Sequence, residues 1–280
     1  MDLLNLSGDA GLIEELIQDG AIFYCSHSGG KDSQAMYAQL RRLVPFEQLV
    51  VVHSDLGAVE WRGVKDHIND TIAHTLNVVQ ANKSFFDMVK HRAKTRPDVP
   101  SWPSSGQRQC TSDLKRNPIY KFIRNDLKAK GALLAINCTG LRAEESTARS
   151  KKQPLTVNNT LSKAGRTVFE WLPIHHWTTD EVFALIREVG QRPFWAYEAG
   201  NKRLSCVFCI MGCASDLANG KKHNPELYAQ YVELEQETGS TMFNGESLDE
   251  RIAKAGTDDA PEPQSIGIDL AEQPKEAQND

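Results

Sequence analysis

The sequence lacks the features of a membrane or secreted protein. No stretch approaches the run of about 20 apolar residues that a membrane-spanning helix needs. The first residues, Met1 to Asn5, include no basic residue and do not resemble the start of a signal peptide. We therefore expect a cytoplasmic protein with no membrane partner, and the sequence leaves its oligomeric state open.

Cysteine is also scarce. Six cysteines in 280 residues are too few for a disulfide scaffold, and clustered thiols in a reducing compartment are more typical of metal binding or redox chemistry. Three of them share one short segment, Cys206-x-x-Cys209-x-x-x-Cys213, whereas Cys25 and Cys138 lie inside apolar runs. We interpret the segment as a candidate set of metal ligands and the other two cysteines as core residues.

An excess of positive charge is absent as well. The formal net charge is −5, and residues 256–280 hold seven acidic residues against one lysine, which leaves the rest of the chain close to neutral. This balance argues against a broad duplex-binding surface but is compatible with a local basic pocket for phosphates. Residues 256–280 also contain prolines and no aromatic residue, so we predict a disordered acidic tail.

Alternating strand and helix patterns predict an α/β fold. β-rich apolar runs are followed by segments with helical periodicity, and repeated units of this kind indicate a doubly wound, mainly parallel sheet. The expected strands cover residues 21–25, 49–53, 78–79 and 133–137, and the expected helices cover 11–19, the segment from Lys31 to Leu43, 60–76 and 179–189.

Two irregular segments are candidate functional loops. The Pro/Ser-rich segment 96–109 is interpreted as a lid, and Lys151 to Arg166 is expected to be a mobile basic loop. Together with Trp102, the basic loop could contact single-stranded nucleic acid, where stacking and charge act together. The alternative is a solvated charged loop.

A short polar motif, Ser28-Gly29-Gly30-Lys31-Asp32-Ser33, lies between a predicted strand and a predicted helix. Glycines let backbone N–H groups approach an anion, and a helix N-terminus adds favourable partial charge. Lys31 and the serines supply further donors. The spacing differs from the G-x-x-x-x-G-K-[ST] loop of ATPases, so a different nucleotide chemistry is implied. The alternative is a tight glycine turn with a helix cap.

This motif matches the SGGKDS pyrophosphate loop (PP-loop) of the adenine nucleotide alpha-hydrolase-like superfamily. Gly140-Leu141-Arg142-Ala143-Glu144-Glu145-Ser146, followed by Arg149, resembles the G-x-R-x-x-E-S-x-x-R signature of phosphoadenosine phosphosulfate (PAPS) reductases, and Pro173-Ile174 with Trp177-Thr178 resembles their next stretch. The resemblance extends from about Ile22 to Cys213. It implies an N-terminal helix at 1–20, a PP-loop nucleotide-binding domain at 21–200 and a smaller, cysteine-containing helical extension at 201–255.

By this resemblance the chain binds ATP or PAPS, with Mg²⁺ accompanying ATP. The candidate catalytic residues are Lys31, Arg142 and Arg149, and the candidate nucleotide-binding residues are Ser28, Gly29, Gly30, Lys31, Asp32, Ser33, Asp55, Gly140, Arg142, Glu145 and Ser146. Guanidinium groups suit bidentate phosphate contacts, although the second motif could also be a solvated helix start with ion pairs. Asp55 could contact the sugar or base of the nucleotide, or cap the next turn.

The resemblance also suggests a metal centre. Cys110-Thr111 with Lys115 and Pro118 resembles the segment in which iron–sulfur members of this family carry a cysteine pair. This implies a four-iron, four-sulfur cluster on Cys110, Cys206, Cys209 and Cys213. Zinc, with His223 or His53 as a substitute ligand, and buried thiols without a metal are the alternatives.

Two departures from the reductase pattern bear on function. The family's cysteine pair is reduced to Cys110-Thr111, and no segment resembles the Glu-Cys-Gly-Leu-His motif whose cysteine attacks the sulfonate in the reductases. Sulfur-transfer relatives, including PAPS-reductase-like proteins of DNA phosphorothioation, combine a PP-loop with cluster cysteines and lack that motif. We therefore favour an enzyme that cleaves ATP at the α-phosphate and transfers sulfur from a sulfur donor to an acceptor, which could be a nucleic acid.

Two alternatives remain from the sequence. The first is a PAPS or adenosine phosphosulfate reductase that uses a thiol reductant and releases sulfite, with a cysteine as the nucleophile. The second is a nucleotide-binding or nucleic-acid-binding module without catalysis.

Overall fold

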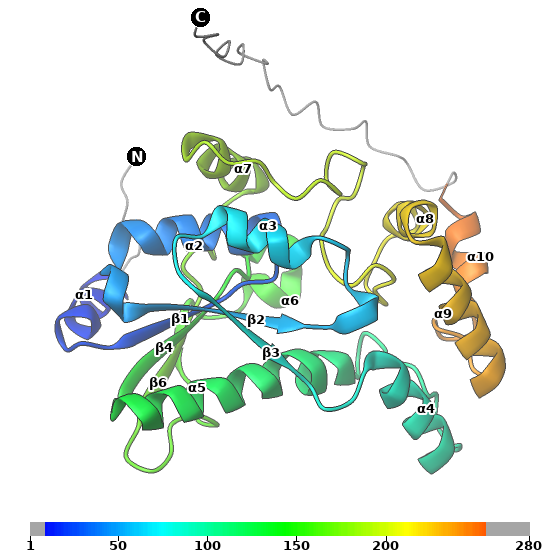
Figure 1. Cartoon of the computed structure of the whole chain (residues 1–280), viewed down its shortest axis with the longest axis horizontal. Helices are drawn as coiled ribbons and strands as arrows, with labels where there is room; N and C mark the ends of the chain where they lie inside the picture. Colours follow the sequence, from blue (N-terminus) through cyan, green and yellow to red (C-terminus); the bar gives the residue numbers. More distant parts are fainter. Residues whose placement is uncertain (1–8, 256–280) are drawn as a thin grey trace, which may run out of the picture.

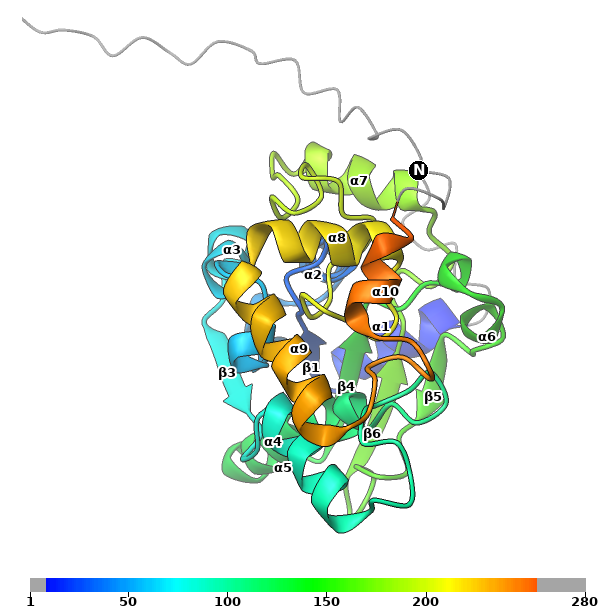
Figure 2. The same cartoon turned by 90° about the vertical axis from the view of Figure 1, so that its right-hand side faces the viewer.

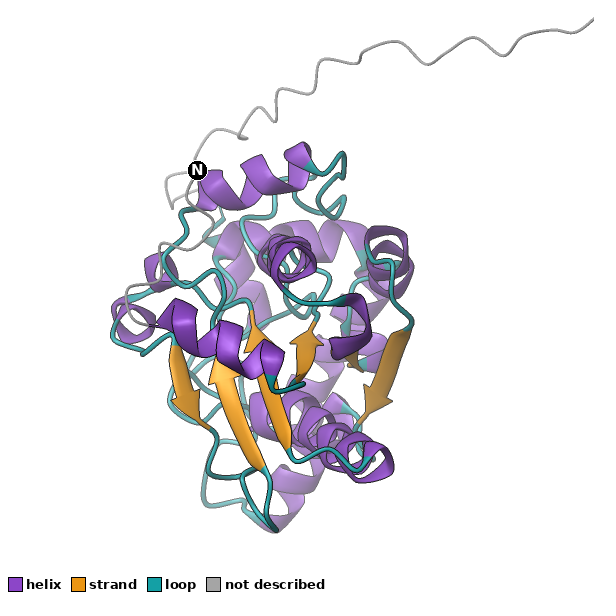
Figure 3. Cartoon of the chain, turned by 90° about the vertical axis from the view of Figure 1, so that its left-hand side faces the viewer, coloured by secondary structure: helices purple, strands orange, loops and turns teal. Residues whose placement is uncertain are grey.

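Apolar residues alternate between the two faces of the central strand, which therefore needs cover on both sides. In the computed structural model, which describes residues 9–255, Phe23 and Cys25 face one hydrophobic core, while Ile22 and Tyr24 face another. Helices lie on both faces of the sheet (Figure 1, Figure 3). The strands of the described residues are β1 Ile22–Ser26, β2 Leu49–Asp55, β3 Leu76–Gln80, β4 Leu134–Thr139, β5 Leu155–Val157 and β6 Thr167–Trp171.

The order of the strands is β3-β2-β1-β4-β6-β5, and each neighbouring pair is parallel except β5 with β6. This confirms the predicted α/β class with a doubly wound, mainly parallel sheet. The α-helices are α1 Asp9–Gln18, α2 Lys31–Leu43, α3 Val64–Thr71, α4 Phe85–Thr95, α5 Asn117–Lys130, α6 Thr147–Ser150, α7 Thr179–Glu188, α8 Ala214–His223, α9 Pro225–Thr238 and α10 Leu248–Ala253.

The C-terminal helices lie at one end of the sheet, where Figure 2 shows α8, α9 and α10 towards the viewer. They share a hydrophobic core with earlier parts of the chain, since Phe208 and Tyr231 pack in one cluster with Trp61, Phe85 and Trp102. The backbone joins here too, because the Val207 N–H donates to the Val59 carbonyl at 3.0 Å. The boundary expected at residue 200 therefore falls inside one continuous core.

Most of the expected elements are present with small shifts at their ends. The helix expected at 60–76 is shorter, because Gly63 takes a left-handed backbone (φ +85°) and α3 begins only after it. α7 begins as expected after Thr178, whose side chain forms a capping box with Glu181. None of the helices within residues 9–255 is long and apolar enough to span a membrane. The acidic tail predicted at 256–280 lies outside the described residues.

The mobile basic loop expected between Lys151 and Arg166 is wrong in part. Leu155–Val157 forms β5, which pairs with β6 at the edge of the sheet. Asn158 and Leu161 are buried, and the Asn158 side chain accepts the N–H groups of the turn at Thr160 and Leu161. Because these residues are ordered at the edge of the sheet, the exposed part of the loop is shorter than the sequence suggested.

Candidate functional site

The phosphate loop, Ser28 to Ser33, connects the central strand β1 to the start of α2, so it lies where ligands bind in open α/β sheets. Gly29 adopts φ +77°, and a Cβ there would lie 2.7 Å from Val64 Cγ1. Only glycine meets both conditions without strain. Ser28 Oγ and Ser33 Oγ lie 3.2 Å apart, and Ser33 Oγ also donates to the Gly30 carbonyl at 2.9 Å. The loop is thus folded on itself with Ser28 as its exposed residue.

A distant segment covers the loop. The Tyr197 hydroxyl accepts a hydrogen bond from the Lys31 N–H at 3.0 Å, and the Lys31 ammonium lies 5.7 Å from the centre of the Tyr197 ring. Leu204 packs against Gly29 and Gly30, within 3.4 Å of the position that a Gly30 Cβ would take. Lys31 is only 5% exposed as a result. The first helical N–H, a natural phosphate donor, is therefore occupied by a tyrosine hydroxyl.

Asp32 joins the loop to the second motif. Its Oδ2 lies 3.0 Å from Lys31 Nζ and its Oδ1 lies 2.7 Å from Arg142 Nε. Arg142 is 2% exposed and also donates to the Trp177 carbonyl at 2.9 Å and to Thr179 Oγ1 at 3.1 Å. Because the Arg142 guanidinium is hydrogen-bonded on several sides, it positions Asp32 and Lys31. It does not offer a pair of free N–H groups to a ligand.

Gly140 explains how the second motif reaches the loop. A Cβ on Gly140 would lie 2.9 Å from the Asp32 carbonyl oxygen and 3.1 Å from the Ser33 nitrogen. Because these are backbone atoms at the start of α2, they cannot move aside as a side chain could. The glycine at the end of β4 lets the two segments approach, and this contact brings Arg142 to Asp32.

Glu145, Ser146 and Arg149 form a local network next to this contact. Glu145 accepts the Arg142 N–H at 3.0 Å and pairs with Arg149, and Arg203 Nη2 lies 3.5 Å from its other oxygen. Ser146 caps α6 by accepting the Arg149 N–H at 3.3 Å. These contacts agree with the alternative interpretation of the second motif, a helix start with ion pairs. Arg203, which sequence reasoning missed, ties the covering segment to the motif.

Two histidines that support the loop were not recognised as such from the sequence. His27 Nδ1 accepts the Gly29 N–H at 3.1 Å, and burial lowers the pKa of His27 to about 3, so the ring is neutral. His53 Nδ1 donates to the His27 carbonyl at 2.9 Å and its Nε2 lies 3.1 Å from Glu60. Burial opposes protonation of His53, but Glu60 raises its pKa overall. The position of His27 between the predicted strand and the loop is the sequence signal that could have identified it as a supporting residue.

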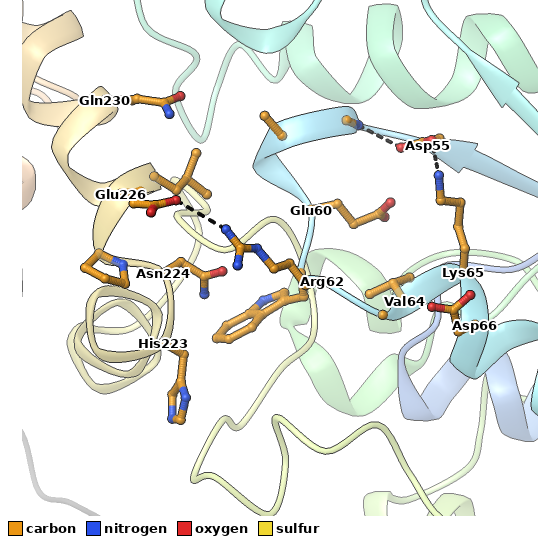
Figure 4. Close-up of a pocket in the computed structure, with 16 residues that line it drawn as sticks. Asp55, Glu60, Arg62, Val64, Lys65, Asp66, His223, Asn224, Glu226 and Gln230 are labelled. Carbon is orange, nitrogen blue, oxygen red and sulfur yellow. Dashed lines mark hydrogen bonds and ion pairs between the residues drawn. The ribbon is translucent and has the colours of Figure 1, made fainter.

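Asp55 lies at the end of β2 beside a cavity of about 480 Å³ between α3 and the junction of α8 with α9 (Figure 4). One carboxylate oxygen accepts the Gly57 N–H at 2.8 Å and the other pairs with Lys65 at 2.8 Å. The structure therefore gives Asp55 the turn-capping contact considered as one alternative. Val64 lines this cavity and also packs on Gly29, so it forms the wall between cavity and phosphate loop.

Three of the candidate thiols gather around a lysine. A π-helical turn, Thr111–Arg116, leads into α5 and carries Lys115, which interacts electrostatically with Cys110, Cys206 and Cys209. The negative charge of ionised thiols, chiefly Cys206, raises the pKa of Lys115. Burial raises the pKa of Cys206 to about 12, although Lys115 opposes that rise. Cys110, Cys206 and Cys209 are called the thiol cluster below, and Cys206 and Cys209 follow closely in sequence on Leu204, the residue that packs on the phosphate loop.

The fourth candidate ligand stands at the start of a helix. Cys213 is the N-cap of α8, and its sulfur is 3.1 Å from Ser215 Oγ. Within residues 9–255 no group of three or more His, Cys, Asp or Glu side chains is arranged to hold a metal ion. The four-cysteine centre therefore stays a prediction that this arrangement does not support. Cys25 and Cys138 are fully buried core residues, as expected.

The stacking role considered for Trp102 is wrong, whereas the lid interpretation of residues 96–109 stays a prediction. Trp102 is 4% exposed, packs against Phe85 and Tyr231, and donates from its indole N–H to the Ser240 carbonyl at 2.8 Å. Arg92 anchors the same segment by hydrogen bonds to the Pro100 carbonyl and to two glutamines. A buried ring cannot stack on a nucleic-acid base.

Comparison with known proteins places these features in a family. The chain is 30% identical over 147 residues to an uncharacterized protein of Escherichia phage 186, and 24% identical over 223 residues to an uncharacterized protein of Methanocaldococcus jannaschii. These matches cover 52% and 78% of this chain, but only 42% of each relative's own length.

Two solved structures match part of the chain. A PAPS reductase from Candida auris in a phosphate complex is 15% identical, with a TM-score of 0.46 over 73% of this chain and 90% of that chain. An FMN adenylyltransferase from Candida glabrata, in complex with FMN and an ATP analog, is 14% identical, with a TM-score of 0.42 over 73% of this chain and 68% of that chain.

The model of the phosphoadenosine phosphosulfate reductase domain matches residues 22–212, which hold the phosphate loop, the Gly140 to Arg149 motif and Cys110, Cys206 and Cys209. The order of strands and the loop after β1 agree with the PP-loop fold. The chain therefore belongs to the phosphoadenosine phosphosulfate reductase family.

Proposed function

We propose that this PP-loop enzyme binds ATP with Mg²⁺, cleaves it between the α- and β-phosphates to adenylate an acceptor, and transfers sulfur through the thiol cluster. The observation that supports this most is the link between loop and thiols. Leu204 packs on Gly29 and Gly30, and Cys206 follows two residues later. The segment that covers the loop therefore also carries a candidate thiol, which supports activation and sulfur transfer on one bound substrate.

In this scheme the phosphate loop holds the leaving pyrophosphate. Ser28, Gly29, Gly30 and Ser33 supply donors, and Lys31 stabilises the negative charge that develops as the bond breaks. Arg142 acts as a positioning residue through Asp32, and Arg149 remains a candidate for contact with the phosphates. Both Asp32 oxygens are paired with cations, so we expect Mg²⁺ to arrive on the phosphates of ATP.

The chemical steps balance with a sulfur donor and a thiol reductant. An oxygen of the acceptor attacks the α-phosphorus, the bond to the β-phosphate breaks, and pyrophosphate leaves with the electron pair. A donor persulfide transfers its outer, sulfane sulfur to the thiolate of Cys206 or Cys209 and leaves as a thiol. The outer sulfur of the new persulfide then displaces AMP from the adenylated acceptor. The other thiol then attacks the resulting disulfide and releases the thiolated acceptor. The reductant finally reduces the bond left between Cys206 and Cys209.

The family match favours a second candidate, sulfonate reduction. Here a thiolate attacks the sulfur of PAPS, the nucleotide leaves, and a second thiol releases sulfite as a disulfide forms. Protein purified without oxygen is given either ATP with Mg²⁺ or PAPS with a thiol donor, and pyrophosphate and sulfite are measured. We expect pyrophosphate from ATP. Sulfite from PAPS alone would favour the reductase, and silence with both substrates would favour a binding module.

The covering tyrosine gives a prediction about affinity. Because the Tyr197 hydroxyl occupies the Lys31 N–H, a phosphate must displace it before it can bind there. Tyr197→Phe removes one competing hydrogen bond, so ATP should bind more tightly by up to about fivefold, which corresponds to roughly 1 kcal/mol. Calorimetric titration with ATP and Mg²⁺ measures this, with Tyr228→Phe on α9 as the control. Weaker binding by Tyr197→Phe would instead indicate that the hydroxyl contacts the bound nucleotide.

A further inference from the structure

A second cavity, of about 430 Å³, opens at the end of the edge strand β3, between α4 and α5. Its volume lies within the range of about 300–1,000 Å³ typical of small-ligand sites. It shares no lining residue with the phosphate loop or with the cavity beside Asp55. The cavity is therefore a separate place on the molecule.

Positive charge converges on this cavity. Lys83 approaches it from the loop before α4, and Lys121 and Arg124 approach it from α5. In the part of the chain that the structure describes, none of the three has an ion-pair partner. Asp113, the one acidic residue in the lining, accepts a hydrogen bond from Ser112.

Two other lysines on the same helices are paired, and the described ion pairs include neither Lys94 nor Lys128, which lie on these helices outside the cavity. Lys90 on α4 lies 2.7 Å from Glu237, and Lys130 on α5 lies 2.7 Å from Asp126. Cations that gather around one cavity repel each other unless an anion joins them. A phosphate bound in the cavity would offset this repulsion.

The rest of the lining suits a nucleotide rather than a bare anion. Met88 and Leu114 are buried and form an apolar floor, and the amide side chains of Asn82 and Asn117 stand at the rim. A base can lie on apolar surface while amides meet the donors and acceptors on its edge. The lining therefore combines the features that recognise phosphate, base face and base edge.

We propose that this cavity binds a nucleotide unit, with its phosphate on Lys83, Lys121 and Arg124 and its base on the floor of Met88 and Leu114. The unit belongs either to single-stranded nucleic acid or to a free mononucleotide, since both present the same chemistry. The turn that holds Leu114 also positions Lys115 at the thiol cluster, and Ser54 at the end of β2 donates to the Leu114 carbonyl at 2.6 Å. The bound unit thus contacts the same π-helical turn as the thiols.

The test is fluorescence anisotropy with a short fluorescein-labelled oligothymidylate at low salt. We expect the double variant Lys83→Ala/Lys121→Ala, two exposed residues, to bind it at least about tenfold more weakly and with a smaller salt dependence. The matched control, Lys94→Ala/Lys128→Ala, removes the same charge from exposed positions on α4 and α5 outside the cavity and should bind like the unchanged protein.

Competition with AMP distinguishes the two sources of the ligand. Displacement of the probe by AMP at similar concentration identifies a mononucleotide site, whereas displacement only by unlabelled oligothymidylate identifies a single-strand site. The Lys31→Ala variant should retain binding, since Lys31 lies outside this cavity. Equal binding by the double variant and its control, no binding of either ligand, or loss in Lys31→Ala alone would overturn the proposal.

Discussion

In the Lys31→Ala variant, the rate of pyrophosphate release from ATP should fall by at least about a hundredfold. Lys31 carries the cation of the phosphate loop, and Asp32 holds its ammonium at 3.0 Å while Arg142 holds Asp32 at 2.7 Å. A charge fixed in this way needs little reorganisation when the leaving group becomes negative. Single-turnover release of pyrophosphate at saturating ATP measures the effect on the chemical step, apart from the effect on binding.

The control for this experiment is Lys90→Ala, which removes the same charge from the exposed surface of α4. The unfolding temperatures of all variants should be compared, because Lys31 is buried. A Lys31→Ala protein that is folded and releases pyrophosphate at the unchanged rate would show that this loop does not stabilise the leaving group.

Gly140→Ala should both destabilise the protein and abolish nucleotide binding at the loop. The added Cβ would meet the Asp32 carbonyl oxygen at 2.9 Å and its carbonyl carbon at 3.0 Å. The end of β4 and the start of α2 would have to separate, and overpacking of this kind typically costs about 1–3 kcal/mol. Separation also draws Arg142 away from Asp32. Thermal unfolding and titration with ATP measure the two effects.

Gly106→Ala is the matched control, because a Cβ at Gly106 meets no atom within 4 Å and its φ is not left-handed. We expect it to keep the unfolding temperature and the affinity of the unchanged protein. A Gly140→Ala protein equal to this control in both measurements would show that the contact between β4 and α2 is not required.

The distribution of apolar residues predicted strands β1 to β4, because buried parallel strands appear in a sequence as short apolar runs. Two strands were missed: β6 was not among the expected strands, and the three residues of β5 at the sheet edge carry almost no periodic signal. The helix around Val64 was extended too far because the apolar spacing continues through Gly63, where the left-handed backbone delays the start of α3. Burial of Trp102 could not be predicted, since the composition of its segment does not show that the ring packs into the core.

For the site, the sequence identified the residues better than their partners. The loop and the second motif do meet, as the resemblance implied, but Arg142 faces Asp32 and the Trp177 carbonyl, a direction that motif spacing cannot reveal. Tyr197 and Arg203 belong to no motif, and they reach the site only through folding. Three of the four candidate thiols gather around Lys115, whereas Cys213 became a helix cap.

The contact between Lys31 and Tyr197 joins residues 166 positions apart in the chain. At a synthesis rate of about 5–20 residues per second, the phosphate loop leaves the ribosome on the order of ten seconds before its cover. During that interval the nascent loop is exposed to the nucleotides of its surroundings. The covering segment therefore limits the access of nucleotides to the loop only after this segment has been synthesised.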